Sequence, residues 1–189
     1  MATMFAKLVS LAYSPRYLLT TNTATMCLIY GTGDVIVQLV DSHRQPPYTT
    51  NIDWKRVFRV GAIGMLHGPM NHFWYGFLDR AALRGSQRVI VAKKVASDLA
   101  ASPAFAVAFV TGLTLLEGNS IREALLEYKQ KFIQIFTLDA CVWPPAQAIN
   151  FWLVPPAFRV LFVSAVVLVY SGLFSAIRHD DHEPVLEVL

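Results

Sequence analysis

Charged residues are scarce in this sequence of 189 residues. Asp, Glu, Lys and Arg make up 15% of the chain, hydrophobic residues make up 54%, and the mean hydropathy is +0.43. Soluble domains carry about 25% charged residues, which cover their surface. The shortage therefore excludes an ordinary soluble domain and predicts an integral membrane protein. The net charge of +3 is too small to require a nucleic-acid partner, and we expect no specific DNA binding.

The sequence also lacks the features of disulfide-rich proteins and of common enzymes. Its two cysteines, Cys27 and Cys141, stand deep in apolar segments, which excludes a disulfide framework and a zinc site built on cysteine pairs. The phosphate-binding G-x-x-x-x-G-K, metalloprotease H-E-x-x-H and hydrolase G-x-S-x-G motifs are missing. We therefore expect no enzyme activity, no cofactor and no metal site.

Long segments with few charges supply the candidate membrane spans. About 20 apolar residues cross a hydrocarbon core about 30 Å thick, and residues 17–40, 57–80, 94–117 and 157–177 have this character. We therefore predict an all-α fold, an integral membrane four-helix bundle that forms one domain over residues 1–177. The charged tail, residues 178–189, is expected to be mobile.

The segment between the third and fourth spans has a different pattern. Ser120 and Glu123 have the spacing of a helix capping box, and apolar residues recur on one helical face as far as Ile135. We predict an amphipathic interfacial helix over residues 120–140. Because prolines follow, residues 141–156 are predicted to form a broken, partly interfacial segment before the last span.

The first 16 residues allow two interpretations. Lys7 and Arg16 are present, and no acidic residue occurs before Asp34, which is typical of mitochondrial import signals. An amphipathic helix that lies on the membrane surface has the same composition.

Polar side chains inside the predicted spans are candidates for function. In the first span, residues at helical spacing share one face: Thr23, Cys27, Tyr30, Asp34 and Gln38. Ionisable groups are costly in lipid, so this face is expected either to form an interhelical hydrogen-bond site or to line a cavity or pore. The candidates for a polar network or cavity along the whole chain are Thr23, Asp34, Gln38, His72, Asp98, Gln147 and Asn150.

Glycines in the second span predict close helix packing. Gly61, Gly64 and Gly68 are separated by three and four residues, and the last two form the small-xxx-small pattern found where membrane helices touch. We expect a neighbouring backbone to lie against this face.

The segment from Cys141 to Arg159 has amides, prolines and tryptophans where a lipid-facing helix would prefer leucine. Prolines remove backbone donors, so Gln147 and Asn150 are expected to replace the lost hydrogen bonds. Their expected partners on other helices are Asp34, Gln38 or His72, and an aqueous vestibule is the alternative. The predicted hinge and anchor residues are Trp143, Pro144, Trp152, Pro155 and Arg159, of which Arg159 either snorkels or pairs with an acid.

Basic residues cluster between the second and third spans: Arg84, Arg88, Lys93 and Lys94. Positive charge beside a span usually binds anionic phospholipid headgroups. Ribosomal RNA is the alternative partner, but no RNA-binding motif with interleaved aromatic residues occurs. We therefore predict a basic surface that faces lipid.

Motifs along nearly the whole chain resemble one family of membrane proteins. They include Gly33-Asp34, Gly68-Pro69 with His72, Leu78-Asp79-Arg80, and the order Trp143-Pro144, Gln147, Asn150-Phe151, Val154-Pro155 and Arg159. The family is that of the twenty-two-kilodalton peroxisomal membrane protein and the Mpv proteins. The resemblance implies a four-helix protein without established enzyme activity, located in the mitochondrial inner membrane or, alternatively, in the peroxisomal membrane.

Two further segments, Leu116-Glu117-Gly118 and Asp139-Ala140-Cys141, look closest to the second Mpv-like branch, which is linked to mitochondrial ribosome assembly. The resemblance therefore implies a non-enzymatic organising factor that supports mitochondrial ribosome assembly and translation. Some family members are described as weakly selective channels, so a channel for small solutes is the alternative. The expected partners are the lipid bilayer, anionic phospholipid, the mitochondrial ribosome and, in a homo-oligomer, a second copy of the chain.

Overall fold

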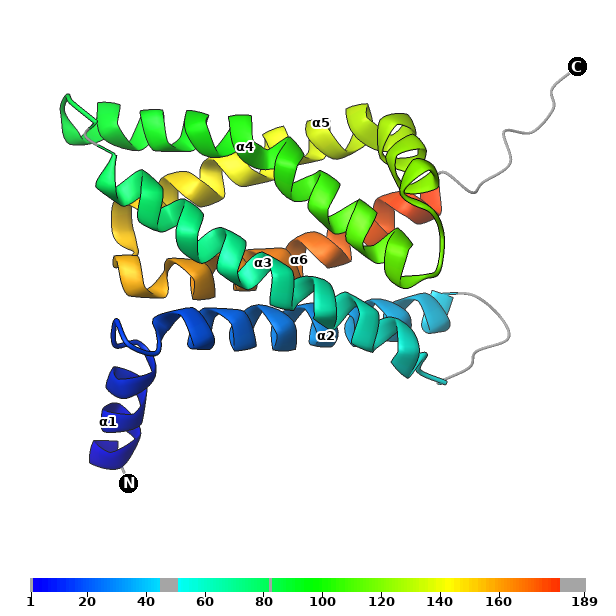
Figure 1. Ribbon diagram of the computed structural model, residues 1–189, viewed down its shortest axis with the longest axis horizontal. Coiled ribbons are helices and arrows are strands. Elements are labelled where there is room, and N and C mark those ends of the chain that lie inside the picture. The colour runs from blue at the N-terminus through cyan, green and yellow to red at the C-terminus, as the bar shows by residue number, and fades with distance from the viewer. Residues whose placement is uncertain (1, 45–50, 82, 181–189) are drawn as a thin grey trace, which may run out of the picture.

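The computed structural model describes residues 2–44, 51–81 and 83–180. All regular elements in these ranges are helices, which confirms the all-α prediction. In chain order they are α1 (Ala2–Ala12), α2 (Leu18–Arg44), α3 (Trp54–Arg80), α4 (Gln87–Leu116), α5 (Ile121–Leu153), the short 3-10 helix η1 (Pro156–Phe158) and α6 (Arg159–Asp180) (Figure 1).

Helices α2 to α6 pack together as a bundle, and α1 projects from it at the N-terminal end of α2 (Figure 1). α2 packs against α3 and α6, and α4 packs mainly against α5. Because α3 also contacts α4, it connects these two groups. Side chains of α3, α4 and α5 therefore meet inside the bundle although they lie far apart in the sequence.

Beside an apolar core, the bundle buries many polar side chains and exposes many large apolar ones, which is unusual for a soluble protein. The buried polar residues include Asn22, Asp34, Gln147, Asn150 and Ser164, and the exposed apolar residues include Leu28, Phe58, Phe73, Phe77 and Leu153. By length and apolar composition, two described helices can cross a membrane, Leu18–Ser42 and Gln87–Leu116, and Pro156–Tyr170 is a shorter apolar helix. A lipid environment accounts for this surface, because polar groups inside a membrane protein turn toward one another.

Helices occupy the four segments predicted as spans, namely α2, α3, α4 and α6. The predicted mobile tail begins at residue 178, where α6 still continues for three residues to Asp180. The rest of the tail, residues 181–189, lies outside the described part of the chain.

Helix α5 corrects the prediction for the segment before the last span. Residues 121–153 form one helix, in place of an interfacial helix over 120–140 and a broken segment over 141–156. Pro144 and Pro145 lie inside α5, so Pro144 is not the expected hinge. Each proline removes one backbone donor but leaves the rest of the helical hydrogen bonds in place, and a full break inside an apolar bundle would leave more backbone groups unpaired.

The helical structure is interrupted at Val154 and Pro155. Val154 is extended, with φ −89° and ψ 125°, because a following proline disfavours helical backbone at the residue before it. Pro155 is extended for the same reason, since Pro156 follows it and opens η1. Of the two predicted hinge prolines, Pro155 is therefore the one at which the helix axis is interrupted.

The N-terminus of α5 carries the predicted capping box. The Ser120 N–H donates to Glu123 Oε2 at 2.7 Å, and Ser120 Oγ accepts from the Glu123 N–H. The hydrogen bonds from the backbone and the hydroxyl of Ser120 hold the pKa of the Glu123 carboxyl below its usual value. Glu123 is therefore ionised at neutral pH and remains an acceptor for the cap.

Replacing Ser120 with alanine is expected to lower the free energy of unfolding by about 1 kcal/mol, because the first turn of α5 loses its side-chain acceptor. The Ser120→Thr variant keeps a hydroxyl and should remain close to the wild type. Thermal unfolding of the purified protein in detergent measures both. Equal melting temperatures for the alanine and threonine variants would show that the cap contributes nothing.

The helices α2 and α3 approach each other closely at two of the three predicted packing glycines. A Cβ atom at Gly64 would lie 2.5 Å from the carbonyl oxygen of Met26, and one at Gly68 would lie 2.5 Å from Cα of Thr23. A Cβ atom at Gly61 would meet its nearest neighbour at 3.6 Å, an ordinary contact. The backbone of α2 therefore requires glycine at Gly64 and Gly68 but tolerates a side chain at Gly61.

Candidate functional site

The centre of the bundle holds a hydrogen-bonded network from α3, α4 and α5. Asp98 accepts from Trp74 Nε1 at 2.8 Å through one carboxylate oxygen and from Gln147 Nε2 at 2.8 Å through the other. Gln147 also donates to the hydroxyl of Tyr75 at 2.7 Å. Its own amide oxygen accepts from Asn150 Nδ2 at 2.8 Å. Both oxygens of Asp98 thus have a donor from another helix, so the network ties the three helices together.

The amides of Gln147 and Asn150 bind side chains, and within the described part of the chain neither side chain bonds to the backbone. The prediction that they replace the hydrogen bonds lost at the prolines is therefore wrong. Their predicted partners, Asp34, Gln38 and His72, are wrong as well, because α5 packs mainly against α4 and meets Asp98 there. Asn150 is fully buried, and its Oδ1 accepts no hydrogen bond from the residues that the structure describes.

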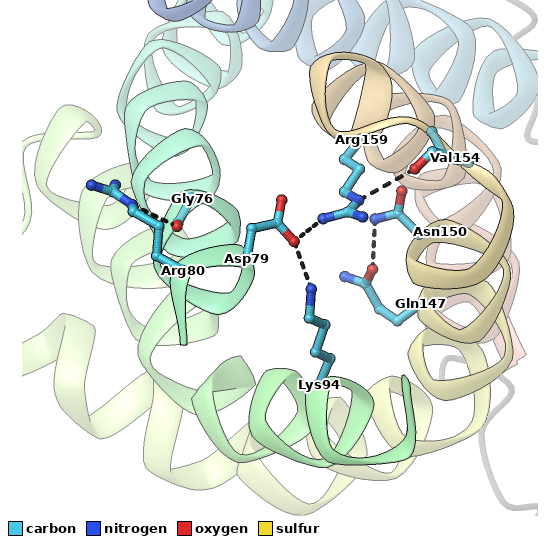
Figure 2. A network of polar contacts seen from close by, with 8 residues as sticks. All are labelled: Gly76, Asp79, Arg80, Lys94, Gln147, Asn150, Val154 and Arg159. Atoms are coloured by element: carbon cyan, nitrogen blue, oxygen red, sulfur yellow. Dashed lines mark hydrogen bonds and ion pairs between the residues drawn. The ribbon is translucent and has the colours of Figure 1, made fainter. Parts of the chain in front are cut away.

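A cluster of charges surrounds Asp79 at the C-terminal end of α3 (Figure 2). Asp79 Oδ1 binds Lys94 Nζ at 2.6 Å and also binds Nη1 of Arg159. Arg159 Nε donates to the carbonyl of Val154 at 3.4 Å, at the end of α5. The two cationic groups lie 5.5 Å (Lys94 Nζ) and 5.3 Å (Arg159 Cζ) from the ring centroid of Phe151. Arg159 therefore pairs with an acid, one of its two predicted roles, and links the break between α5 and α6 to α3.

The basic residues predicted to face lipid fall into two groups. Lys94 turns toward Asp79, and only 12% of its side chain is exposed. Its assignment to the lipid-facing surface is therefore wrong, because its ammonium group forms an ion pair with an acid on the neighbouring helix. Arg84, Arg88 and Lys93 are exposed, and Lys93 Nζ donates to the Arg84 carbonyl at 2.9 Å. Lipid binding by these three residues stays a prediction.

A third cluster joins α2 to the start of α3. The buried Asp34 pairs with Arg56 Nε at 2.9 Å and accepts from Gln38 Nε2 at 2.7 Å. Gln38 Oε1 in turn accepts from the Asp53 N–H at 2.7 Å, and Asp53 Oδ1 accepts from the Arg56 N–H at the first turn of α3. Asp34 thus takes part in an interhelical hydrogen-bond site, one of the two alternatives considered for it.

The other polar residues of the first predicted span have separate partners. The Thr23 hydroxyl donates within α2, to the Leu19 carbonyl at 2.8 Å. His72 Nδ1 accepts from Asn22 Nδ2 at 3.1 Å, and a hydrogen bond of 2.8 Å joins Tyr30 to His67. The polar face of α2 is therefore divided among several local contacts along its length.

The two predicted tryptophan anchors have different surroundings. Trp143 is half-buried, its Nε1 donates to Asp139 at 3.0 Å, and its indole packs on Tyr170 with ring centroids 5.8 Å apart. Tyr170 also donates to Asp139, at 3.0 Å. Trp152 is 47% exposed, as an anchor in the membrane interface would be. The N–H of Trp143 is thus used by a buried acid, and interfacial anchoring by either tryptophan stays a prediction.

Residues of these clusters that were not among the predicted site residues include Arg56, Trp74, Tyr75, Asp79, Asp139 and Tyr170. A signal existed for Asp79 and Asp139, since each is an acid in or beside a long apolar segment, as Asp34 is. Their partners depend on how the helices pack, and the sequence pattern carries no such information.

Each of the three acidic clusters joins neighbouring helices. The carboxylates of Asp34, Asp79 and Asp98 are each bound by donors from a neighbouring helix. Within residues 2–44, 51–81 and 83–180, no three His, Cys, Asp or Glu side chains lie together as possible metal ligands.

Comparison with known proteins identifies relatives over most of the chain. Residues 114–175 match the model of the Mpv17 / PMP22 family. PXMP2/4 family protein 2 of Dictyostelium discoideum is 30% identical over 168 residues, covering 87% of this chain and 86% of the relative. The Mpv17-like protein of Xenopus laevis is 30% identical, with coverage of 89% and 81%. The mitochondrial inner membrane protein Mpv17 of Danio rerio is 26% identical, with coverage of 78% and 82%. No solved structure matches the chain.

Proposed function

The chain belongs to the Mpv17 / PMP22 family and is a protein of the mitochondrial inner membrane, and on this premise we propose that it is a non-enzymatic organising factor that supports mitochondrial ribosome assembly and translation. The motifs that resemble the second Mpv-like branch support the ribosomal role. One structural observation carries the choice of an organising role over a transport role: the polar side chains inside the bundle bind one another across helices.

A pore and an interhelical network place polar side chains differently. In a pore, carboxylates and amides face water along the path of the solute. Here Asp98 is bound by Trp74 and Gln147, and Asp34 is bound by Arg56 and Gln38. These bonds fix the positions of the helices and leave the apolar outer surface to lipid. A rigid bundle of this kind is suited to present a fixed surface to a partner.

We further propose that α2, α3, α4 and α6 all cross the membrane. α2 and α4 have the length and apolar composition of spans. α3 is more polar, but its polar residues His67, Asn71 and Tyr75 are buried while Phe58, Phe73 and Phe77 are exposed. Such a helix can lie in lipid because its polar groups turn toward its neighbours. α6 continues from the hinge at Pro155 with the shorter apolar segment Pro156–Tyr170.

Sedimentation tests the ribosomal role. Mitochondria that contain the tagged protein would be solubilised in mild detergent and separated on a sucrose gradient, with an unrelated inner-membrane protein as the control. We expect a fraction of the tagged protein to migrate with a ribosomal subunit, and the control to remain in the light fractions. If the protein stays with the control, and its removal leaves the amounts of both subunits unchanged, the proposed role is wrong.

A weakly selective channel is the second candidate function. Asn150 favours it, because its buried Oδ1 has no donor among the described residues and such an acceptor is suited to a passing solute or water. The two candidates differ in what they predict for solute flux.

A further inference from the structure

The cluster around Asp79 contains more positive than negative charge. Lys94 and Arg159 both bind the same oxygen of one carboxylate, Asp79 Oδ1. The nearest acid along α4, Asp98, is one helical turn beyond Lys94, and both of its oxygens already have donors. Among the residues that the structure describes, the two cations therefore share a single counterion.

The two cations are poorly hydrated. The side chains of Lys94 and Arg159 are only 12% and 8% exposed, and the ring of Phe151 lies beside both of their charges. A positive charge removed from water is costly unless an anion or a hydrogen-bond acceptor offsets it. Asp79 is the most accessible member of the cluster, with 26% of its side chain exposed. An anion from outside can therefore approach the two cations on the side where Asp79 lies.

The surroundings of the cluster attract anions. Residues 79–94 contain five basic residues, Arg80, Arg84, Arg88, Lys93 and Lys94, and one acid, Asp79. They occupy the end of α3, the connection to α4 and the first turns of α4, and Arg159 joins them from the start of α6. Arg80 points away from the cluster, with its Nε bound to the Gly76 carbonyl at 2.9 Å (Figure 2). This end of the bundle is thus positive both at its surface and at its buried cluster, which raises the local concentration of anions.

We propose that Lys94 and Arg159 form a binding site for a phosphate group, and that Asp79 is the internal counterion which the phosphate displaces. A guanidinium presents two parallel N–H donors that match two phosphate oxygens, and a lysine adds a point charge. The phosphate belongs either to a free phosphate compound or to the headgroup of an anionic phospholipid. This site goes beyond the organising role proposed above and does not depend on it.

The test uses the full-length protein, purified in detergent and freed of lipid. The probe is inorganic phosphate, titrated against sodium chloride at constant ionic strength, with the melting temperature and isothermal calorimetry as readouts. Lys94→Gln should weaken phosphate binding by about tenfold or more, because a charge-assisted hydrogen bond is lost. The matched control is Lys129→Gln, which removes an exposed lysine on α5, outside the basic segment, and should bind phosphate like the wild type.

The Asp79→Asn variant gives a readout that a purely structural role would not produce. Removing the competing carboxylate should tighten phosphate binding by about tenfold, since the two cations then have no internal counterion. Phosphate should also raise the melting temperature of this variant more than that of the wild type. Unchanged or weaker binding by Asp79→Asn would overturn the displacement mechanism.

A second arm separates the two sources of phosphate. Vesicles of phosphatidylcholine with and without cardiolipin would be mixed with the wild type and with the Lys94→Gln and Lys129→Gln variants, and retained lipid would be measured after purification. Binding of inorganic phosphate that Lys94→Gln weakens identifies a free phosphate compound. Cardiolipin retention that only Lys94→Gln weakens, without binding of inorganic phosphate, identifies a headgroup. If neither probe binds, or if the two lysine variants behave alike, the site does not exist.

Discussion

Replacing Gly64 with alanine is expected to destabilise the bundle by about 1–3 kcal/mol, the usual penalty for an extra methyl group in a packed interface. The new Cβ atom would lie 2.5 Å from the Met26 carbonyl oxygen, 2.8 Å from its carbonyl carbon and 2.9 Å from Cα of Cys27. All three atoms belong to the backbone of α2, so no side-chain rotation can relieve the overlap. The two helices must move apart, and contacts along the whole α2–α3 interface are weakened.

Gly61 provides the matched control, because it lies one turn earlier on the same helix and on the same interface. Its Cβ atom would lie 3.6 Å from the Cys27 carbonyl oxygen, which is an ordinary contact. Alanine is a better helix former than glycine by roughly 0.5–1 kcal/mol, so Gly61→Ala should be neutral or slightly stabilising. Thermal unfolding in detergent and size-exclusion chromatography would compare the two variants. Equal stability of Gly64→Ala and Gly61→Ala would contradict the close approach of α2 and α3 at Gly64.

Replacing Gln147 with leucine is expected to lower the free energy of unfolding by about 2 kcal/mol or more. Gln147 donates to Asp98 and Tyr75 and accepts from Asn150, so its loss leaves three polar groups with fewer partners. A buried polar group without a partner costs about 1–3 kcal/mol. Leucine has a similar size, so the loss arises from the missing hydrogen bonds rather than from a cavity.

The control for this change is Gln130→Leu, which replaces an exposed glutamine on the same helix. It should leave the melting temperature nearly unchanged, since it breaks no buried contact. The Asn150→Leu variant should have an intermediate effect of about 1 kcal/mol, because it removes one donor from the network. A Gln147→Leu protein as stable as Gln130→Leu would show that the central network contributes little to the fold.

The sequence predicts where the helices lie more accurately than it predicts which residues contact one another. Apolar segments of span length correspond to α2, α3, α4 and α6, because the length of an apolar segment is a local property. The three-and-four spacing of glycines likewise indicated the face of α3 that touches α2. Pro144 was misjudged, since the effect of a proline depends on whether the surrounding bundle leaves room for a break, which is a tertiary property.

For the polar site too, the sequence predicts which residues take part but not which residues they bind. Asp98, Gln147 and Asn150 were predicted as members of a polar network because polar groups in apolar helices must find partners. Their actual partners, Trp74 and Tyr75, follow from the packing of α5 against α4 and of α3 against α4, which no spacing rule contains. Lys94 was misassigned for a related reason: its distance from Asp79 in sequence is fifteen residues, and only the α3–α4 connection brings the two charges together.

Solute release from liposomes tests most directly whether the polar network ties the helices together or lines a pore. Purified wild-type protein would be reconstituted beside the Gln147→Leu and Gln130→Leu variants, with circular dichroism to check that each is folded. We predict that small neutral and anionic solutes leave the wild-type liposomes no faster than protein-free liposomes. Rapid release through the wild type, altered by Gln147→Leu and unchanged by Gln130→Leu, would contradict the organising role and identify the network as the lining of a channel.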